Sequence, residues 1–329
     1  MRSSTMDRRD FLCSAAAVAG AAIAQPVLGQ VAGRKALTRK ERVDRALQGK
    51  DVDRVPFTHW HHMGPQTAEV HAQATLDYHW KFKTDIVKVM SDFAYPKPKG
   101  NWYELKALED PFPEQIRALE MIRSGLKGDA YFIETVFNPW QVAVNLSSRE
   151  EVFRMQKENP QRLLDALEVL TESSIHHAKR AFATGAAGIL FAIANPKRSD
   201  LTPEEYARFS APFDKRIVDA TAGARLNFLH LHWENEYVNQ FGGWDAAVVN
   251  WSTQVSGVQV STVRAKFKQA LATGIDEVKY KELTMAEMRA QWQSAREAAG
   301  GMFILTPGCS VPNDTSDEEL MRMAELVGA

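Results

Sequence analysis

Short apolar runs recur along the chain and alternate with longer segments in which apolar residues follow helical spacing. Runs of this length are typical of buried strands, and the longer segments are typical of amphipathic helices. We predict strands at 55–57, 85–90, 131–137, 188–193, 226–232, 246–251 and 302–305, and a weaker one at 265–275. Alternating strands and helices imply a parallel α/β sheet, and about eight repeats favour closure into a single (β/α)8 TIM barrel.

The predicted helix starts share a capping signal. A hydroxyl residue stands three positions before a glutamate at Thr38–Glu41, Ser147–Glu150, Thr202–Glu205, Thr284–Glu287 and Ser316–Glu319. The hydroxyl accepts a hydrogen bond from an amide of the first turn, and the glutamate accepts one from the capping residue. The chain lacks the glycine-rich loops that bind nucleotide phosphates, which counts against an open nucleotide-binding sheet.

The composition narrows the class of protein. A length of 329 residues suits one large α/β domain, and the formal net charge of -1 gives no basic field that would favour a nucleic-acid partner. The two cysteines are too few for a disulfide framework.

The N-terminus has the pattern of an export signal. The pair Arg8-Arg9 precedes an apolar, alanine-rich stretch at 15–24 that ends in small residues. This pattern resembles the twin-arginine signal, and the stretch is shorter than the roughly 20 residues of a membrane span. We expect a signal peptide and linker at 1–30, a barrel domain at 31–329, recognition by the twin-arginine export machinery and a periplasmic location. The alternative is a disordered or weakly helical N-terminus.

Two histidines and a cysteine form a candidate metal site. His230 and His232 lie two residues apart on a predicted strand and therefore project to the same side. Cys309 follows the last predicted strand, and parallel barrel strands end at one rim. Imidazole and thiolate are preferred zinc ligands, and three protein ligands with one open position are typical of catalytic zinc. The alternative is a packed histidine and a small buried cysteine.

Other polar residues follow the predicted strands and are candidates for substrate chemistry. The cluster His59-Trp60-His61-His62 follows the first strand, and Asp92 ends the second. We assign His61 to proton transfer and His59 and His62 to substrate binding, with partly solvated rim imidazoles as the alternative. Asp92 is a catalytic candidate that could stabilise positive charge or accept hydrogen bonds, or else a helix N-cap. Further candidates for substrate contact are Trp140, Asn145 and Trp251.

From about Arg42 to the C-terminus, the chain resembles the uroporphyrinogen decarboxylase superfamily, which includes corrinoid-linked methyltransferases. The matching segments are 42–47, 53–56, 85–92, 138–140 and 308–313. The resemblance implies a single (β/α)8 barrel. It also places Asp92 on the catalytic aspartate that binds pyrrole groups in the decarboxylases.

The differences from the decarboxylases concern substrate binding. Those enzymes carry arginines after the first strand that bind substrate carboxylates. In this chain the corresponding residues, 59–64, have the sequence His-Trp-His-His-Met-Gly and contain no arginine. A substrate with many carboxylates would lose its bidentate partners. Asn145 falls on the decarboxylase tyrosine, and Cys309 falls on the histidine of the final turn.

The zinc ligands of the methyltransferase branch are a His-x-Cys pair and a cysteine in a Gly-Cys turn. This chain has His230-x-His232 and Gly308-Cys309. The resemblance therefore implies zinc and methyl or related group transfer, with a corrinoid or tetrapyrrole as substrate or partner. Decarboxylation of a tetrapyrrole carboxylate and non-catalytic binding of such a ligand are the alternatives. We also expect a small-molecule substrate and a homodimer.

Overall fold

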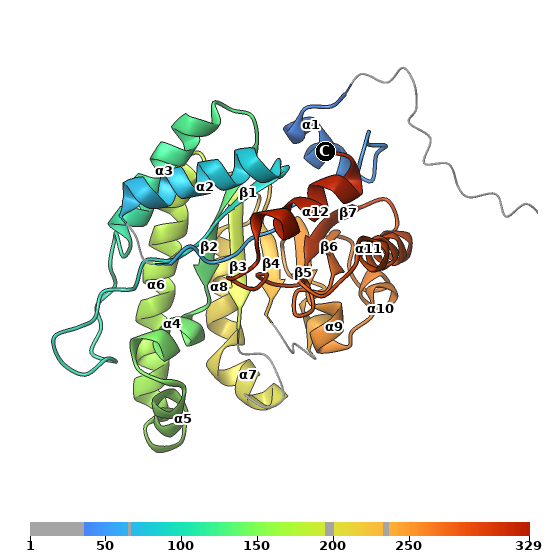
Figure 1. Cartoon of the computed structure of the whole chain (residues 1–329). Helices are drawn as coiled ribbons and strands as arrows, with labels where there is room; N and C mark the ends of the chain where they lie inside the picture. The colour runs from blue at the N-terminus through green and yellow to red at the C-terminus, as the bar shows by residue number, and fades with distance from the viewer. Residues whose placement is uncertain (1–35, 65–66, 195–200, 233–236) are drawn as a thin grey trace, which may run out of the picture. The chain divides into compact units, whose positions relative to one another are not determined.

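In the described part of the chain, seven parallel strands form one sheet whose spatial order follows the sequence (Figure 1). The computed structural model describes residues 36–329 except 65–66, 195–200 and 233–236, so the predicted signal peptide lies outside the described residues. The strands are β1 (Ile86–Val89), β2 (Tyr131–Phe137), β3 (Gly188–Ile193), β4 (Phe228–Leu231), β5 (Val248–Trp251), β6 (Ala270–Ile275) and β7 (Phe303–Pro307). Seven of the eight predicted strands are confirmed.

The first predicted strand, at 55–57, is wrong as a strand. Phe57 makes only an isolated parallel bridge to Leu305 of β7, whose amide donates to the carbonyl of Pro56 (2.9 Å). On the other side, the amide of Asp85 donates to the carbonyl of Phe57 (2.9 Å). Proline has no amide proton, so this segment cannot form a regular ladder. The sheet is therefore a curled parallel sheet of seven strands, and the expected eight-stranded barrel is not confirmed.

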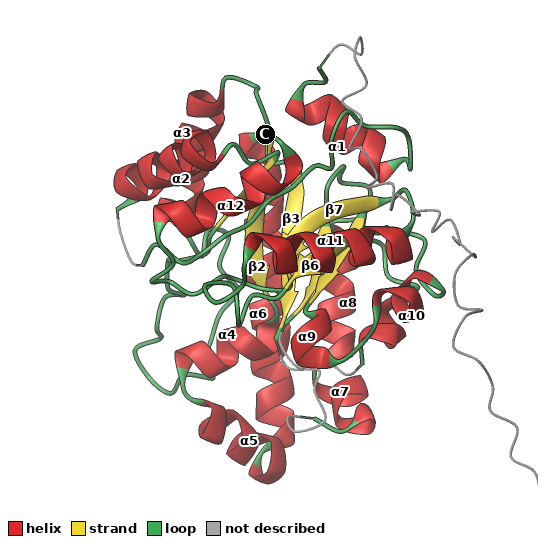
Figure 2. Ribbon diagram, turned by 45° about the vertical axis from the view of Figure 1, so that its right-hand side comes forward, coloured by secondary structure: helices red, strands yellow, loops and turns green. Residues whose placement is uncertain are grey.

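Helices cover the outer side of the sheet (Figure 2). They are α1 (Arg39–Leu47), α2 (Ala68–Phe82), α3 (Pro113–Leu126), α4 (Pro139–Leu146), α5 (Arg149–Glu158), α6 (Pro160–Thr184), α7 (Pro203–Phe209), α8 (Ala211–Ala220), η1 (Val238–Phe241), α9 (Thr253–Ser256), α10 (Val260–Arg264), α11 (Met285–Ala299) and α12 (Asp317–Val327). None of the helices among the described residues combines the length and the apolarity of a membrane span.

Four of the five predicted capping boxes are confirmed, at the starts of α1, α7, α11 and α12. The fifth prediction is wrong by one residue, because Ser148 rather than Ser147 caps α5 and accepts from the amide of Glu151 (3.1 Å). Ser147 is already engaged, since its hydroxyl donates to the carbonyl of Ala143 at the end of α4 (2.8 Å).

Alternate residues of the strands pack on opposite sides of the sheet. One buried cluster draws a residue from every strand and therefore fills the inside of the curl: Ile86, Ile133, Leu190, Phe228, Val248, Ala270 and Ile304. Val87 and Val89 instead pack with residues of α2 and α3 on the outer side. Both sides of the sheet are buried, so its strands are nearly continuous apolar runs in the sequence.

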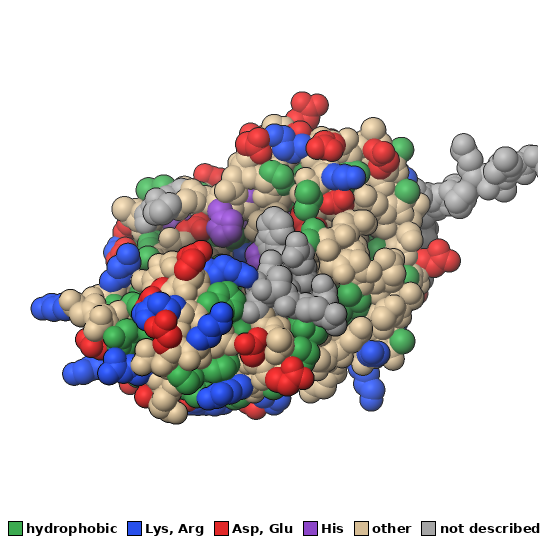
Figure 3. Space-filling model, turned by 90° about the horizontal axis from the view of Figure 1, so that it is seen from below, with side chains coloured by type: hydrophobic (Ala, Val, Ile, Leu, Met, Phe, Trp, Pro, Cys, Tyr) green, Lys and Arg blue, Asp and Glu red, His purple; other side chains and the backbone are tan. Residues whose placement is uncertain are grey.

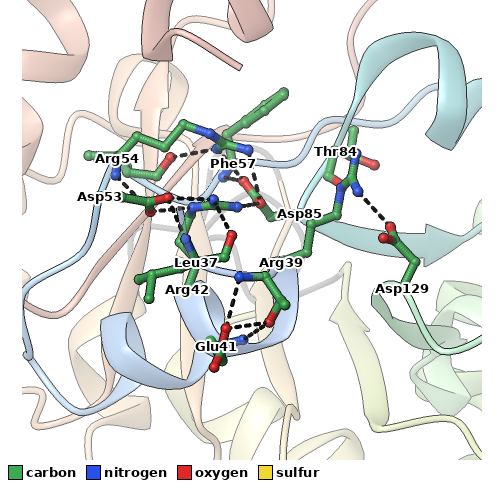
Figure 4. A network of polar contacts seen from close by, with 12 residues as sticks. Leu37, Arg39, Glu41, Arg42, Asp53, Arg54, Phe57, Thr84, Asp85 and Asp129 are labelled. Carbon is green, nitrogen blue, oxygen red and sulfur yellow. Dashed lines mark hydrogen bonds and ion pairs between the residues drawn. The ribbon is translucent and has the colours of Figure 1, made fainter. Parts of the chain in front are cut away.

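A buried ion-pair network ties α1 to the amino end of β1 (Figure 4). The carboxylate of Asp85 accepts from Arg42 Nη1 (2.6 Å), Arg54 Nη1 (2.6 Å) and the amide of Phe57 (3.0 Å). Arg42 also pairs with Asp53 (2.7 Å). The network lies at the amino end of the sheet, away from the strand ends that carry the candidate site.

A second buried carboxyl group makes stability depend on pH. Asp214 in α8 is fully buried and accepts from the hydroxyl groups of Ser210 (2.8 Å) and Tyr206 (3.2 Å). Burial raises the pKa of Asp214 to about 7, against about 3.9 in an unfolded chain. Folding therefore favours the neutral form. The stabilisation is complete below about pH 4 and is lost as the pH rises through about 7.

We expect Asp214→Asn to remove this pH dependence. The difference in free energy of unfolding between the variant and the wild type should change by about 4 kcal/mol between pH 4 and pH 8, in favour of the variant at high pH. Urea unfolding across that range measures it, with Asp219→Asn, an exposed pair partner of Lys215, as the control. Parallel pH curves for Asp214→Asn and the wild type would contradict the assignment.

Candidate metal centre and substrate cavity

The three predicted metal ligands meet at the carboxyl ends of β4 and β7. His230 lies in β4, His232 follows it, and Cys309 follows β7. His230 Nε2 is 3.4 Å from His232 Nδ1, and Cys309 Sγ is 3.7 Å from the first nitrogen and 3.3 Å from the second. Residues that are almost 80 positions apart in the sequence thus form one cluster, while the metal itself stays a prediction.

The spacing of the three donor atoms fits a tetrahedral zinc ion. With Zn–N near 2.0–2.1 Å and Zn–S near 2.3 Å, tetrahedral angles place two nitrogens about 3.3 Å apart and a nitrogen and a sulfur about 3.6 Å apart. The observed separations of 3.4, 3.7 and 3.3 Å are close to these values. The side chains need to move by only a few tenths of an ångström to bind the ion.

Asn250 fixes the orientation and the tautomer of His230. It lies directly opposite His230 in the β4–β5 ladder, and its Oδ1 is 2.5 Å from His230 Nδ1. The Asn250 amide group donates to Ala272 O (2.8 Å) and Thr306 Oγ1 (3.0 Å), so Oδ1 is the atom that accepts. His230 therefore carries its proton on Nδ1 and directs the Nε2 lone pair at Cys309. Metal-binding histidines commonly have such a partner.

Burial keeps His230 and Cys309 uncharged in the metal-free site. It lowers the pKa of His230 to about 4, so this imidazole is neutral at pH 7. It raises the pKa of the Cys309 thiol to about 11, so metal binding must release the thiol proton. Gly308 brings Cys309 this close to β5, because a Cβ at that position would lie 2.3 Å from Ser252 Cα. The turn therefore needs glycine.

A cavity of about 440 Å³ opens beside the ends of β1 and β2. It contains three predicted site residues, His62, Asp92 and Asn145, among mainly apolar side chains. Asp92 accepts from the Met63 amide (3.2 Å) and pairs with His62 Nδ1 (3.0 Å). Burial alone would raise the pKa of Asp92, but the hydrogen bonds from His62 and Met63 outweigh it and lower the pKa. Figure 3 views the side where the strands end and shows histidine side chains there.

The structure does not place His59 and His61 in this cavity. His59 is buried, contacts the Tyr78 hydroxyl through Nδ1 and packs against Phe82. Burial lowers its pKa to about 3. His61 Nδ1 donates to the carbonyl of His62 (3.0 Å), and its ring lies 5.0 Å from that of Tyr78. His62, rather than His61, is thus the imidazole that lines this cavity, and the roles assigned to His59 and His61 stay predictions.

Trp140 and Trp251 are core residues. The ring of Trp140 packs against Phe153, and the indole of Trp251 donates to the carbonyl of Val258 (3.0 Å). Both side chains are buried and neither lines the cavity, so the structure does not bring them together with His62, Asp92 and Asn145. In β5 the neighbouring residue Asn250, not Trp251, faces the metal ligands. Asn250 could have been recognised from the sequence as a polar residue within an apolar, buried strand.

The chain is thus an α/β protein with a metal-type ligand cluster at its strand ends. Residues 81–329 match the uroporphyrinogen decarboxylase (URO-D) family, and the chain belongs to this family. Comparison with curated proteins gives no match.

Two solved structures are similar in fold. One is a methyltransferase from Methanosarcina mazei, with a TM-score of 0.72 and 16% identity over 88% of this chain and 98% of that chain. The other is a B12-independent methionine synthase from Shewanella sp. W3-18-1, solved in complex with selenomethionine. Its TM-score is 0.56 and its identity 12%, over 82% of this chain and 91% of that chain.

Proposed function

We propose that the chain is a zinc-dependent enzyme that transfers a methyl or related group, with His230, His232 and Cys309 as the ligands. The observation that carries the proposal is the near-tetrahedral spacing of the three donor atoms. The orienting contact from Asn250 supports it. Family membership and the fold shared with a methyltransferase and a methionine synthase favour group transfer as the reaction class.

The side chains around the site have separate tasks in this proposal. Bound zinc would lower the pKa of a thiol or water in the open fourth position. Asn250 holds the His230 ring, and Cys309 contributes the one anionic ligand. In the adjacent cavity, Asp92 orients His62 through Nδ1 and leaves Nε2 as the atom placed to take or give a proton.

The test is methyl transfer from a corrinoid. Zinc-loaded full-length protein is mixed with methylcobalamin and 2-mercaptoethanol, and the loss of methylcobalamin absorbance and the formation of the methyl thioether are followed. We expect equal amounts of demethylated corrinoid and thioether, and no turnover by His230→Ala. His176→Ala, on the outer helix α6, is the matched histidine control. Zinc-loaded wild type that forms no thioether would overturn the proposed transfer.

A second candidate function is decarboxylation of a tetrapyrrole carboxylate, and Asp92 in the cavity wall is the observation that favours it. Both oxygens of Asp92 are already engaged by His62 and Met63. Among the described residues that line the cavity, Lys97 is the only lysine or arginine, which is a poor match for several carboxylates. Incubation with uroporphyrinogen followed by chromatography decides it, since loss of carboxylates would establish this activity.

We further propose export to the periplasm by the twin-arginine pathway, from the sequence around Arg8 and Arg9. This pathway carries folded proteins, which suits an enzyme whose metal is inserted first. Cell fractionation should find the protein in the periplasm and the Arg8→Lys, Arg9→Lys double variant in the cytoplasm. An unchanged distribution of the double variant would contradict the proposal.

A further inference from the structure

Strand β1 carries a lysine, Lys88, on the inner side of the curled sheet. Its alternate neighbours Ile86 and Met90 belong to the inner apolar cluster, whereas Val87 and Val89 pack against helices on the outer side. Lys88 itself is only partly exposed. Lysine is rare in such places, because the ammonium group must give up part of its hydration.

The ammonium group of Lys88 has no carboxylate partner among the described residues. Its Nζ lies 2.6 Å from Met90 Sδ and 5.4 Å from the centre of the Trp60 ring. A thioether and an aromatic face attract a cation weakly and do not neutralise it. The contacts among the residues that the structure describes therefore leave the positive charge uncompensated.

The nearest acidic side chains are committed elsewhere. Three acidic groups act on the charge of Lys88: the Cys309 thiol, which acts most strongly, and the carboxylates of Asp92 and Glu134. Asp92 is held by His62 and Met63. Glu134 faces the helices, where it accepts from Gln115 Nε2 (2.8 Å) and contacts His177 Nε2 (3.0 Å). The Cys309 thiol is neutral in the metal-free protein, because burial raises its pKa to about 11, and zinc would take up the thiolate charge in the loaded site. None of these three side chains therefore neutralises Lys88.

Trp60 connects Lys88 with the metal ligands. The Lys88 ammonium lies over its ring, and the His230 ring meets the same indole edge to face, with 6.3 Å between the ring centres. Burial lowers the pKa of Lys88 to about 8, so the group is still mainly protonated at pH 7. A fixed positive charge thus stands beside the metal ligands at the strand ends.

We propose that Lys88 is a specificity residue that binds a carboxylate of the substrate while another group of that substrate reacts at the His230–His232–Cys309 centre. The substrate class is then a small organic acid. This inference rests on the proposed function. Its physical basis is that an uncompensated cation near a reaction site gains most from a ligand that supplies the missing anion.

The test compares two thiols with the same three-carbon chain, one ending in a carboxylate and the other in a neutral hydroxyl group. Full-length protein is loaded with Co²⁺, and the cobalt–thiolate absorbance is titrated with 3-mercaptopropionate and with 3-mercapto-1-propanol. We expect the wild type to bind the acid about tenfold more tightly than the alcohol, Lys88→Met to lose this preference and Lys88→Arg to keep part of it. Lys127→Met, an exposed lysine at the other end of the sheet, is the control. The same ratio in wild type and Lys88→Met would overturn the inference.

A metal-free arm separates this inference from the proposed function. If no cobalt spectrum develops, the metal proposal fails. Thermal unfolding of the metal-free protein then tests whether Lys88 binds a carboxylate. Sodium propionate should raise the wild-type Tm by about 2 °C over sodium chloride of equal ionic strength, and should not raise that of Lys88→Met. Equal shifts in both proteins, or no shift in either, would overturn the role of Lys88.

Discussion

Cys309→Ala is expected to purify without tightly bound zinc, whereas the wild type should hold about one zinc ion per chain. The substitution removes the only ligand of the cluster that becomes anionic on binding. We expect zinc affinity to fall by at least about 100-fold, because two neutral imidazoles remain. Elemental analysis after dialysis and competition with a chromophoric chelator measure stoichiometry and affinity.

A graded variant distinguishes ligand loss from a general disturbance of the site. Asn250→Ala keeps all three ligands but removes the acceptor at His230 Nδ1, and should cost about 10- to 100-fold in affinity. His176→Ala should bind zinc like the wild type. Equal zinc content in the wild type and Cys309→Ala would refute the metal centre.

Asp85→Ala is expected to have the largest effect on stability, lowering the free energy of unfolding by about 3–5 kcal/mol. The Asp85 side chain is completely buried, and Arg42 and Arg54 both donate to it at 2.6 Å. Its removal leaves two guanidinium groups without their shared partner in a largely dry environment. Urea unfolding monitored by circular dichroism provides the measurement.

An exposed ion pair provides the comparison for Asp85. Asp317 pairs with Lys81 on the surface, and Asp317→Ala should change stability by less than about 1 kcal/mol. If Asp85→Ala were no more damaging than Asp317→Ala, the network of Figure 4 would not anchor α1 to the sheet.

Local patterns were sufficient to predict most of the secondary structure. Apolar runs located seven strands, and four capping boxes marked their helices correctly, since both signals depend on residues close together in the sequence. The segment at 55–57 looked like a strand from its apolarity. It forms a single bridge because Pro56 lacks an amide proton.

The candidate site, too, was predicted from the sequence only in part. His230, His232 and Cys309 could be proposed because strand ends and side-chain alternation are visible in the sequence. The sequence analysis did not identify Asn250 and Lys88, because the role of each depends on a contact with a residue of another segment. The choice between Asn250 and Trp251 depended on which side of β5 faces the inside of the curl.

Chain periodicity and the family motifs thus predicted the parallel α/β class, most of its strands and the candidate metal-binding residues at their ends. Folding in three dimensions settled the number of regular strands, the 3.3–3.7 Å spacing of the donor atoms and the partners of Asp92 and Lys88. The physical reason is the separation along the chain between the residues that interact. Helix caps and strand alternation act over a few residues, whereas strand register and burial depend on segments that meet only when the sheet curls.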